Sequence, residues 1–309
     1  MVSLPDNASA ASKIAVIGLG SMGFGMARSL KRAGLDVTGY DVESAAVQRF
    51  VAEGGLGART LAEAVKDADI VVSVVVNAVQ TESVLFGPEG VGQAMRPGAV
   101  FVSSATMDPA VARGLAKRVE ALGLHYLDAP ISGGASKAAS GELTIMASGS
   151  KQAFAAARPA LDAMATKVYE LGEEAGTGAA FKMINQLLAG VHIAAACEAI
   201  TFAAKQGLDL GKVYEVITAS AGNSWMFENR VPHVLAGDYT PLSAIEIFVK
   251  DLGIIQDMAR AERYPVPLAA AALQMYLAAS GAGMGLDDDS SLARLYAQLS
   301  GATLPAAAK

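Results

Sequence analysis

The 309-residue sequence has one cysteine, Cys197, and only three histidines. A single cysteine excludes an intramolecular disulfide and a cysteine-based zinc site. His125, His192 and His233 are too scattered to match a metal-ligand spacing, so no metal site is expected. Charged residues make up 17% of the chain, the net charge is -6, and no cluster of lysine and arginine stands out. Nucleic acid is therefore not an expected partner.

Targeting signals and membrane-spanning runs are also lacking. The N-terminal stretch MVSLPDNASAASK has neither the charged region nor the apolar region of a signal peptide, and we expect residues 1–12 to be a disordered lead-in. The apolar stretch PVPLAAAALQMYLAAS, which starts at Pro265, is too short to span a membrane. With 52% hydrophobic residues, the sequence predicts a compact, cytoplasmic globular protein without a membrane partner.

The first half of the chain alternates strand-like runs with helical patterns. Apolar runs rich in β-branched residues predict strands at 14–18, 36–40, 69–76, 99–105 and 124–130, with further candidates at 143–149 and 167–172. Continuous apolar strands separated by helices are typical of a parallel sheet that is covered on both faces. The predicted fold class is therefore α/β, with a doubly wound parallel sheet in residues 13–175.

The pattern changes after the glycine-rich stretch GEEAGTG at 172–178. From there the sequence shows long alanine-rich helical patterns and almost no strand signal, which predicts an all-helical domain over residues 176–309. Its first helix is expected to run from about residue 177 to residue 206. A helical domain this apolar also favours burial against another subunit, so we expect a homodimer or a homotetramer.

A glycine-rich loop lies between the first predicted strand and the first helix, in IAVIGLGSMGFGMARSL. Gly18 permits a tight turn, Gly20 lets a pyrophosphate approach the backbone, and Gly23 allows the helix to pack close to the strand. The pyrophosphate would lie over the N-terminal amides of the helix. The alternative is an ordinary glycine-rich turn. The predicted cofactor-binding residues of this loop are Gly18, Leu19, Gly20, Ser21, Met22 and Gly23.

Asp41 follows the second predicted strand, in GYDVES. A carboxylate at this point accepts hydrogen bonds from the adenosine ribose hydroxyls of NAD. The 2′-phosphate of NADP would instead need a cation, and this turn has no lysine or arginine. The predicted cofactor is therefore NAD.

Four motifs, spread over almost the entire chain, resemble those of the β-hydroxyacid dehydrogenase family. They are GLGSMGFGMA, DAPISGG at 128–134, GTGAAFKMINQ at 176–186 and KDL at 250–252. The family includes 3-hydroxyisobutyrate and 6-phosphogluconate dehydrogenases. The resemblance implies an N-terminal Rossmann domain, an all-α C-terminal domain that serves substrate binding and oligomerisation, and a site in the crevice between them.

The resemblance assigns Lys182 as the catalytic acid/base. A base that removes a hydroxyl proton needs a pKa near the working pH, and burial or a nearby positive charge lowers the pKa of lysine. The alternative is a lysine that extends to solvent. Asn185 and Gln186 share a helix face with Lys182 and are expected to orient the substrate. The family usually has a second asparagine at the position of Gln186, whose side chain is one methylene longer, and this departure fits a different substrate.

The remaining site residues also follow from the resemblance. Ser132, Gly133 and Gly134 would hold the substrate carboxylate, although a flexible loop is the alternative. Three further residues would lie near the cofactor, and for Asn77 a strand cap and for Lys250 a solvated surface position are the alternatives. These residues are Asn77, Thr106 and Lys250.

Several stretches are most similar to the members of the family that oxidise L-threonate, among them NQLLAGVHIAAACEA and SWMFENRVPHVLAGDYTP. The expected reaction is the NAD-dependent oxidation of a small anionic hydroxy acid, with L-threonate as the preferred substrate. A 3-hydroxyisobutyrate dehydrogenase and a reductase of tartronate semialdehyde or another short oxo acid are the enzymatic alternatives. A non-catalytic dinucleotide-binding protein is the alternative from another class.

Overall fold

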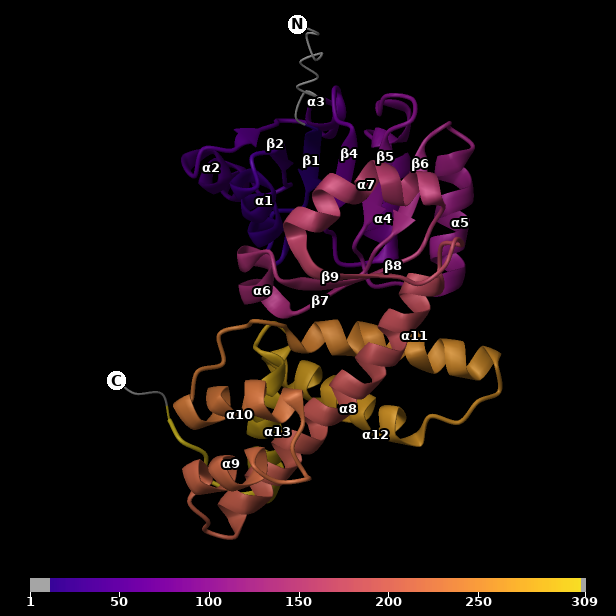
Figure 1. Cartoon of the computed structure of the whole chain (residues 1–309). Coiled ribbons are helices and arrows are strands. Elements are labelled where there is room, and N and C mark those ends of the chain that lie inside the picture. Colours follow the sequence, from indigo (N-terminus) through magenta and orange to yellow (C-terminus); the bar gives the residue numbers. More distant parts are fainter. Residues whose placement is uncertain (1–11, 307–309) are drawn as a thin grey trace, which may run out of the picture. The chain divides into compact units, whose positions relative to one another are not determined.

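The computed structural model describes residues 12–306, and the chain divides into two compact units between Lys182 and Met183 (Figure 1). We call the described residues before this division unit 1 and those after it unit 2. The division falls inside one helix, α8 (Thr177–Lys205). Apart from Ser12, the predicted lead-in at residues 1–12 lies outside the described residues.

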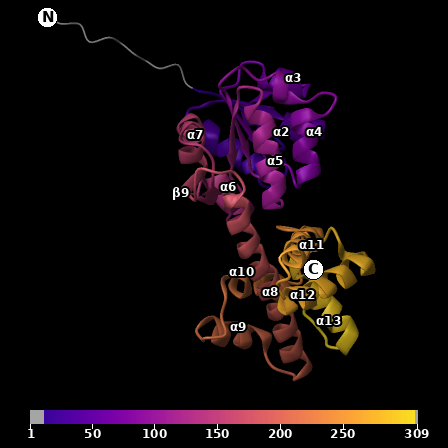
Figure 2. The same ribbon diagram turned by 90° about the vertical axis from the view of Figure 1, so that its right-hand side faces the viewer.

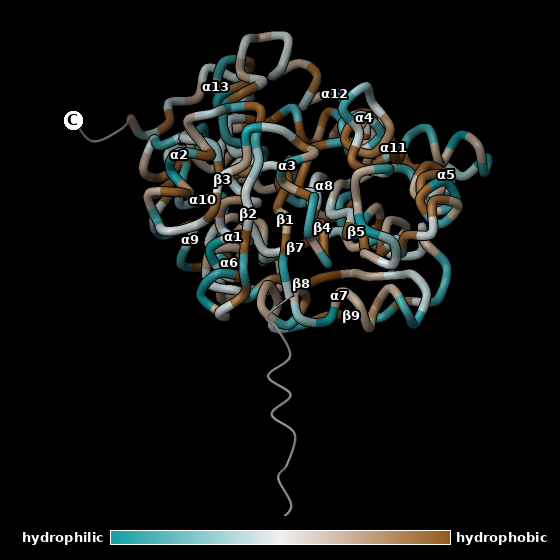
Figure 3. The backbone as a smooth tube through the Cα atoms, turned by 90° about the horizontal axis from the view of Figure 1, so that it is seen from above, coloured by the Kyte–Doolittle hydropathy of each residue, from teal (hydrophilic) through white to brown (hydrophobic). Residues whose placement is uncertain are grey.

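Unit 1 is built on a six-stranded sheet in the order β3-β2-β1-β4-β5-β6, in which every pair of neighbours is parallel. Figure 3 shows β3, β2, β1, β4 and β5 in this order. The order reverses between β1 and β4, which confirms the predicted doubly wound sheet. The strands are β1 (Lys13–Ile17), β2 (Asp36–Tyr40), β3 (Leu56–Gly57), β4 (Ile70–Ser73), β5 (Val100–Ser103) and β6 (His125–Asp128).

Helices cover both faces of this sheet because alternate strand residues point to opposite sides. Ile14 and Val16 of β1 belong to one apolar core, and Ala15 and Ile17 belong to the other. The first core includes α1 (Gly23–Arg32), α2 (Ser44–Ala52) and α7 (Lys151–Met164); the second includes α3 (Leu61–Val65), α4 (Ala78–Phe86) and α5 (Pro109–Glu120). Figure 2 shows α7 on one side of the sheet and α4 and α5 on the other.

A second, three-stranded sheet follows, in the order β7-β8-β9. It contains β7 (Ile131–Ser132), β8 (Leu143–Ala147) and β9 (Ala165–Glu170), with α6 (Gly134–Ser140) between β7 and β8. β7 and β8 are antiparallel, whereas β8 and β9 are parallel. The strand candidates at 143–149 and 167–172 are thus strands, but they lie outside the six-stranded sheet. The two-residue strands β3 and β7 were not predicted.

The described residues of unit 2 form helices joined by loops, with one isolated β-bridge between Ala244 and Asp288, which confirms the predicted helical C-terminal region. A Cβ atom at Gly190 would lie only 3.0 Å from Phe248, so glycine lets α8 and α11 pack closely. Cys197 lies in the apolar core of this unit and is 2% exposed. The further helices are α9 (Leu210–Thr218), α10 (Trp225–Ala236), α11 (Ile245–Ala261), α12 (Pro267–Ala279) and α13 (Leu292–Ser300).

The helix α8 begins at Thr177 and ends at Lys205, one residue before the predicted end. It is long and apolar enough to cross a membrane by length and composition, and half of its most apolar 18-residue window is buried inside the protein. The core helix of a soluble protein meets the same two criteria, so this finding is weak evidence for a membrane span.

Candidate active site

The glycine loop between β1 and α1 has the shape that a dinucleotide requires. Gly18 has a φ of +93°, and a Cβ atom there would lie 2.7 Å from the carbonyl oxygen of Val74. A Cβ atom at Gly23 would lie 1.8 Å from the carbonyl oxygen of Gly18, so only glycine fits this helix start. At Gly20, by contrast, a Cβ atom would meet no protein atom within 4 Å. The loop therefore has no room for a side chain at Gly18 or Gly23, whereas the space beside Gly20 is free of protein atoms, which fits a pyrophosphate.

The other loop residues divide between the core and the surface. The Leu19 side chain is fully buried, Ser21 is exposed and Met22 packs against the core. The Leu19 N–H donates to Oδ2 of Asp41 over 2.6 Å, and the Glu43 N–H donates to Oδ1 over 2.8 Å. Asp41 thus ties the end of β2 to the glycine loop. A carboxylate has about four lone-pair positions, so Asp41 can still accept bonds from ribose hydroxyls.

Asn77 and Thr106 lie close to the ends of neighbouring strands, β4 and β5. The Asn77 side chain caps α4, because its Oδ1 accepts the Gln80 N–H over 2.9 Å. Thr106 is half-buried and precedes α5. In a parallel sheet both positions lie at the carboxyl ends of the strands, where ligands bind in this architecture. Their cofactor contacts remain predictions.

The segment at 132–134 exposes its backbone between β7 and α6. Ser132 pairs with Thr144 in the small sheet. Gly133 has a φ of +136° and Gly134 a φ of +76°, conformations that L side chains rarely adopt. Neither residue has a side chain, and Gly134 is exposed, which is compatible with the approach of an anion to the backbone. Carboxylate binding here remains a prediction.

Lys182 lies in the second turn of α8 and is only 7% exposed, which argues against a side chain that extends to solvent. The first turn of this helix is held by Asp128, whose Oδ2 accepts the Gly176 N–H over 2.8 Å and the Ala179 N–H over 2.9 Å. Ser148 adds a second anchor, because its Oγ accepts the Gly178 N–H over 2.9 Å.

Asp128 is 1% exposed, and burial raises the pKa of its carboxyl to about 6. The hydrogen bonds from Ala179, Gly176 and Ser148, and the charge of Arg113, act in the opposite direction on this pKa. Neither Asp128 nor Ser148 was among the predicted site residues. The signal available was the aspartate that opens DAPISGG, but its partners lie 48 and 51 residues further along the chain.

A hydrogen-bonded group in unit 2 includes three predicted site residues. Asn185 Nδ2 donates to Oε1 of Gln186 over 3.0 Å, and Gln186 Nε2 donates to Oδ2 of Asp251 over 2.5 Å. The Lys250 ammonium pairs with Oδ1 of the same carboxylate. Asp251 is fully buried, as is expected only for a paired carboxylate. Gln186 follows Lys182 by one helical turn, so the two share a face of α8. The predicted place of Lys250 near the cofactor stays a prediction.

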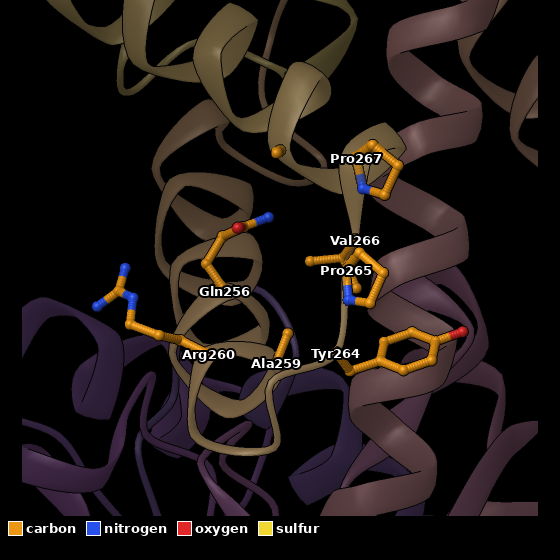
Figure 4. Close-up of a pocket in the computed structure, with 8 residues that line it drawn as sticks. Gln256, Ala259, Arg260, Tyr264, Pro265, Val266 and Pro267 are labelled. Atoms are coloured by element: carbon orange, nitrogen blue, oxygen red, sulfur yellow. The ribbon is translucent and has the colours of Figure 1, made fainter.

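A separate cavity of about 290 Å³ lies in unit 2, between the end of α11 and the start of α12 (Figure 4). Gln256, Val266 and Pro267 line it, and the Arg260 and Tyr264 side chains extend to opposite sides. Ligand sites combine an apolar pocket with converging polar groups, and these polar groups diverge. This cavity contains none of the predicted site residues.

Comparisons with known proteins agree with this geometry. Residues 13–172 match the family described as the NAD binding domain of 6-phosphogluconate dehydrogenase, and residues 176–296 match the NAD-binding domain of NADP-dependent 3-hydroxyisobutyrate dehydrogenase. The chain is 54% identical to an L-threonate dehydrogenase of Cupriavidus necator over 92% of this chain and 95% of that protein. It is 49% identical to an L-threonate dehydrogenase of Escherichia coli over 95% of this chain and 97% of that protein.

Among solved structures, a 3-hydroxyisobutyrate dehydrogenase from Salmonella typhimurium has a TM-score of 0.88 and 50% sequence identity, over 92% of this chain and 99% of that chain. The family matches, these relatives and the open glycine loop agree with one another. The chain belongs to the β-hydroxyacid dehydrogenase family and is a hydroxyacid dehydrogenase that uses a nicotinamide dinucleotide.

Proposed function

We propose that the protein oxidises L-threonate to its 2-oxo acid with NAD as the cofactor. The observation that carries this proposal is the buried Lys182, one helical turn before Gln186, in a chain 49–54% identical to L-threonate dehydrogenases along almost its whole length. Gln186 is bonded to Asp251 and Asn185, so its amide is held in a fixed orientation. A fixed amide suits recognition of one hydroxyl of a polyhydroxy acid.

Lys182 is the proposed acid/base. When bound, the oxidised cofactor supplies the hydride acceptor for the carbon that carries the hydroxyl. Nζ of Lys182, in its neutral form, accepts the proton of that hydroxyl, and in the reverse direction the ammonium returns the proton to the carbonyl oxygen. Lys182 is only 7% exposed, so bulk water has little access to the side chain that would exchange this proton.

The substrate carboxylate is assigned to Ser132, Gly133 and Gly134. The two glycine amides and the serine hydroxyl are donors, and no side chain at 133 or 134 blocks an approaching anion. Asn185 and Gln186 are assigned to the substrate hydroxyls. A small anionic hydroxy acid has both kinds of group, which is why this set of donors favours it.

The choice of NAD depends on Asp41, since its negative charge would repel the 2′-phosphate of NADP. We assign the cofactor to the loop from Gly18 to Gly23, to Asp41, and to Asn77 and Thr106 at the strand ends. Asp41→Asn keeps acceptor capacity on the turn and removes the charge. We expect it to raise kcat/KM with NADP+ relative to NAD+ by about tenfold. An unchanged ratio would contradict the assignment of NAD to this carboxylate.

The decisive experiment is the initial rate of NADH formation with L-threonate, D-threonate, D-erythronate, 3-hydroxyisobutyrate and glycerate. Lys182→Ala is expected to lower kcat with the preferred substrate by about a thousandfold or more. The matched control is Lys212→Ala, because Lys212 is exposed and pairs with Glu215. An active Lys182→Ala enzyme would remove the acid/base role, whatever the substrate.

Each of the three alternatives has a distinct outcome in kinetic or binding assays. Preference for 3-hydroxyisobutyrate, the substrate in the name of the Salmonella typhimurium neighbour, would keep the mechanism and change the substrate. Faster reduction of tartronate semialdehyde would indicate a short oxo-acid reductase. Tight NADH binding without turnover of any hydroxy acid would indicate a binding protein.

We also propose a cytoplasmic homodimer or homotetramer in which a second copy covers α8. Five exposed apolar residues form a stripe along this helix: Ile184, Leu188, Ala195, Ala199 and Phe202. They are separated by four, seven, four and three residues, which places them on one side of the helix. Leu188→Glu should lower the mass measured by sedimentation. A wild-type monomer at micromolar concentration would contradict the proposal.

A further inference from the structure

The N-terminal end of α8 has an unusual anchor. Oδ2 of Asp128 accepts three hydrogen bonds: from the Gly176 N–H, from the Ala179 N–H, and from Oγ of Ser148 over 3.4 Å. Oγ of Ser148 in turn accepts the Gly178 N–H. Three backbone donors at this helix start, which have no partner inside the helix, are thus bound by two buried side chains.

The backbone on this side of α8 also fits closely against the small sheet. A Cβ atom at Gly178 would lie 2.3 Å from the carbonyl oxygen of Met146 and 3.0 Å from that of Asp128. Asp128 and Ser148 themselves exchange two backbone hydrogen bonds, of 3.0 Å and 2.8 Å. The anchor therefore connects the end of β6, the end of β8 and the first turn of α8 at one buried point.

Lys182 lies about one helical turn after the anchored residues. It follows Ala179 by three residues and Gly178 by four, so it lies on the same face as the anchored turn. Long side chains on a helix lean toward its N-terminus, back over the preceding turn. A small shift of the first turn would therefore shift the position of Nζ.

We infer that Asp128 and Ser148 are positioning residues that set the place of the Lys182 amine by fixing the first turn of α8. This inference rests on the proposed acid/base role of Lys182. A displacement of about 1 Å at a reacting group can lower a rate by about a hundredfold, so loss of the anchor should act on kcat rather than on cofactor affinity.

The test compares Ser148→Ala and Asp128→Ala with Asp128→Asn. Oδ1 of Asp128 is buried and has no hydrogen-bond partner among the described residues, so all the acceptor function lies on Oδ2. Asparagine can place its own oxygen there and keep both backbone bonds. We expect kcat with L-threonate to fall about ten- to hundredfold in the alanine variants and to stay within about threefold of wild type in Asp128→Asn. The dissociation constant of NADH should not change.

The matched control is Ser150→Ala. Ser150 caps α7 in the same unit, where its Oγ accepts the Ala153 N–H over 3.2 Å, but α7 does not carry Lys182. This variant should keep the wild-type kcat. If Ser148→Ala also keeps it, or if Ser150→Ala lowers kcat by the same factor, the inference is overturned.

A second readout does not depend on activity. Amide hydrogen exchange should become faster at residues 176–179 in Ser148→Ala, and remain at the wild-type rate there in Ser150→Ala. If Lys182→Ala proves active, the proposed function fails, whereas the exchange data still report whether the anchor holds the helix. Unchanged exchange at 176–179 in Ser148→Ala would overturn the inference even in an active enzyme.

Discussion

The side-chain amide of Gln186 donates to the buried carboxylate of Asp251 over 2.5 Å, and Lys250 pairs with the other oxygen of that carboxylate. The amide of Gln186 therefore has three partners: Asn185, Asp251 and, by our proposal, the substrate. Its length is what allows it to reach Asp251 from α8.

Gln186→Asn shortens this side chain by one methylene. We expect the bond to Asp251 to be lost, which leaves a buried acceptor less satisfied and frees the amide to rotate. The value of kcat/KM for L-threonate should fall about ten- to hundredfold, while the dissociation constant of NADH stays unchanged. Steady-state kinetics and NADH fluorescence titration measure the two effects. Equal efficiency of the variant and wild type would show that the reach of Gln186 is not needed.

Because Lys250 and Asp251 form an ion pair, substitutions at the two residues should have non-additive effects on the free energy of unfolding. Lys250→Met leaves the fully buried Asp251 without its cation, and breaking such a pair costs about 3–5 kcal/mol. Adding Asp251→Asn removes the unpaired charge, so the double variant should unfold at a higher urea concentration than Lys250→Met alone. A double-mutant cycle from urea unfolding gives the coupling energy. Strict additivity would contradict the pairing.

Gly20 and Gly23 should respond differently to alanine. At Gly23 the new methyl group would lie 1.8 Å from the carbonyl oxygen of Gly18, so Gly23→Ala should destabilise the protein by about 3 kcal/mol or more. At Gly20 the space is open, so Gly20→Ala should fold normally and bind NADH at least about tenfold more weakly. Thermal unfolding and NADH titration separate the two outcomes. Normal NADH binding by Gly20→Ala would argue against a pyrophosphate at this residue.

The raised pKa of Asp128 predicts that the free energy of unfolding depends on pH. Its pKa is raised from 3.8 to about 6, so between these values the folded state holds a proton that the unfolded state has released. This contribution to stability is fully present below about pH 4 and is lost as the pH rises through about 6. At 1.4 kcal/mol for each pKa unit, the loss is about 3 kcal/mol.

The variant Asp128→Asn cannot ionise, so its stability relative to wild type should rise between pH 4 and pH 7. Urea unfolding of both proteins across this range measures that difference, in which all other ionisable groups cancel. A constant difference would show that the pKa of Asp128 is not raised. Since Asp128→Asn also retains the hydrogen-bond acceptor, we expect it to gain stability relative to wild type as the pH rises, with nearly normal kcat.

Much of the fold could be predicted from local patterns. The strand at Asp36–Tyr40 and the start of α8 at Thr177 agree with the predicted bounds, because β-branched runs and long alanine-rich patterns are strong signals. The two-residue strands β3 and β7 have no periodicity to detect. The division of the strands into two sheets depends on pairing between distant segments, such as Ile131 with Ile145, which no local pattern reports.

The candidate site was predictable where one motif contains the whole feature. The glycine loop has this property, since Gly18 and Gly23 act within one turn. The anchor of α8 does not: Asp128, Ser148 and Gly176 come from three separate segments of the chain, and only the folded chain brings them together. The bond between Gln186 and Asp251 was missed for the same reason, since it spans 65 residues.

The burial of Cys197 has a practical consequence. It is the only thiol in the sequence, and burial raises its pKa well above the ordinary value, so the reactive thiolate is scarce at neutral pH. The wild-type enzyme should therefore tolerate maleimides and air without a reducing agent. A cysteine introduced at an exposed position such as Lys212 would be the one that reacts, so fluorophores or spin labels can be attached at chosen sites without first removing the native thiol.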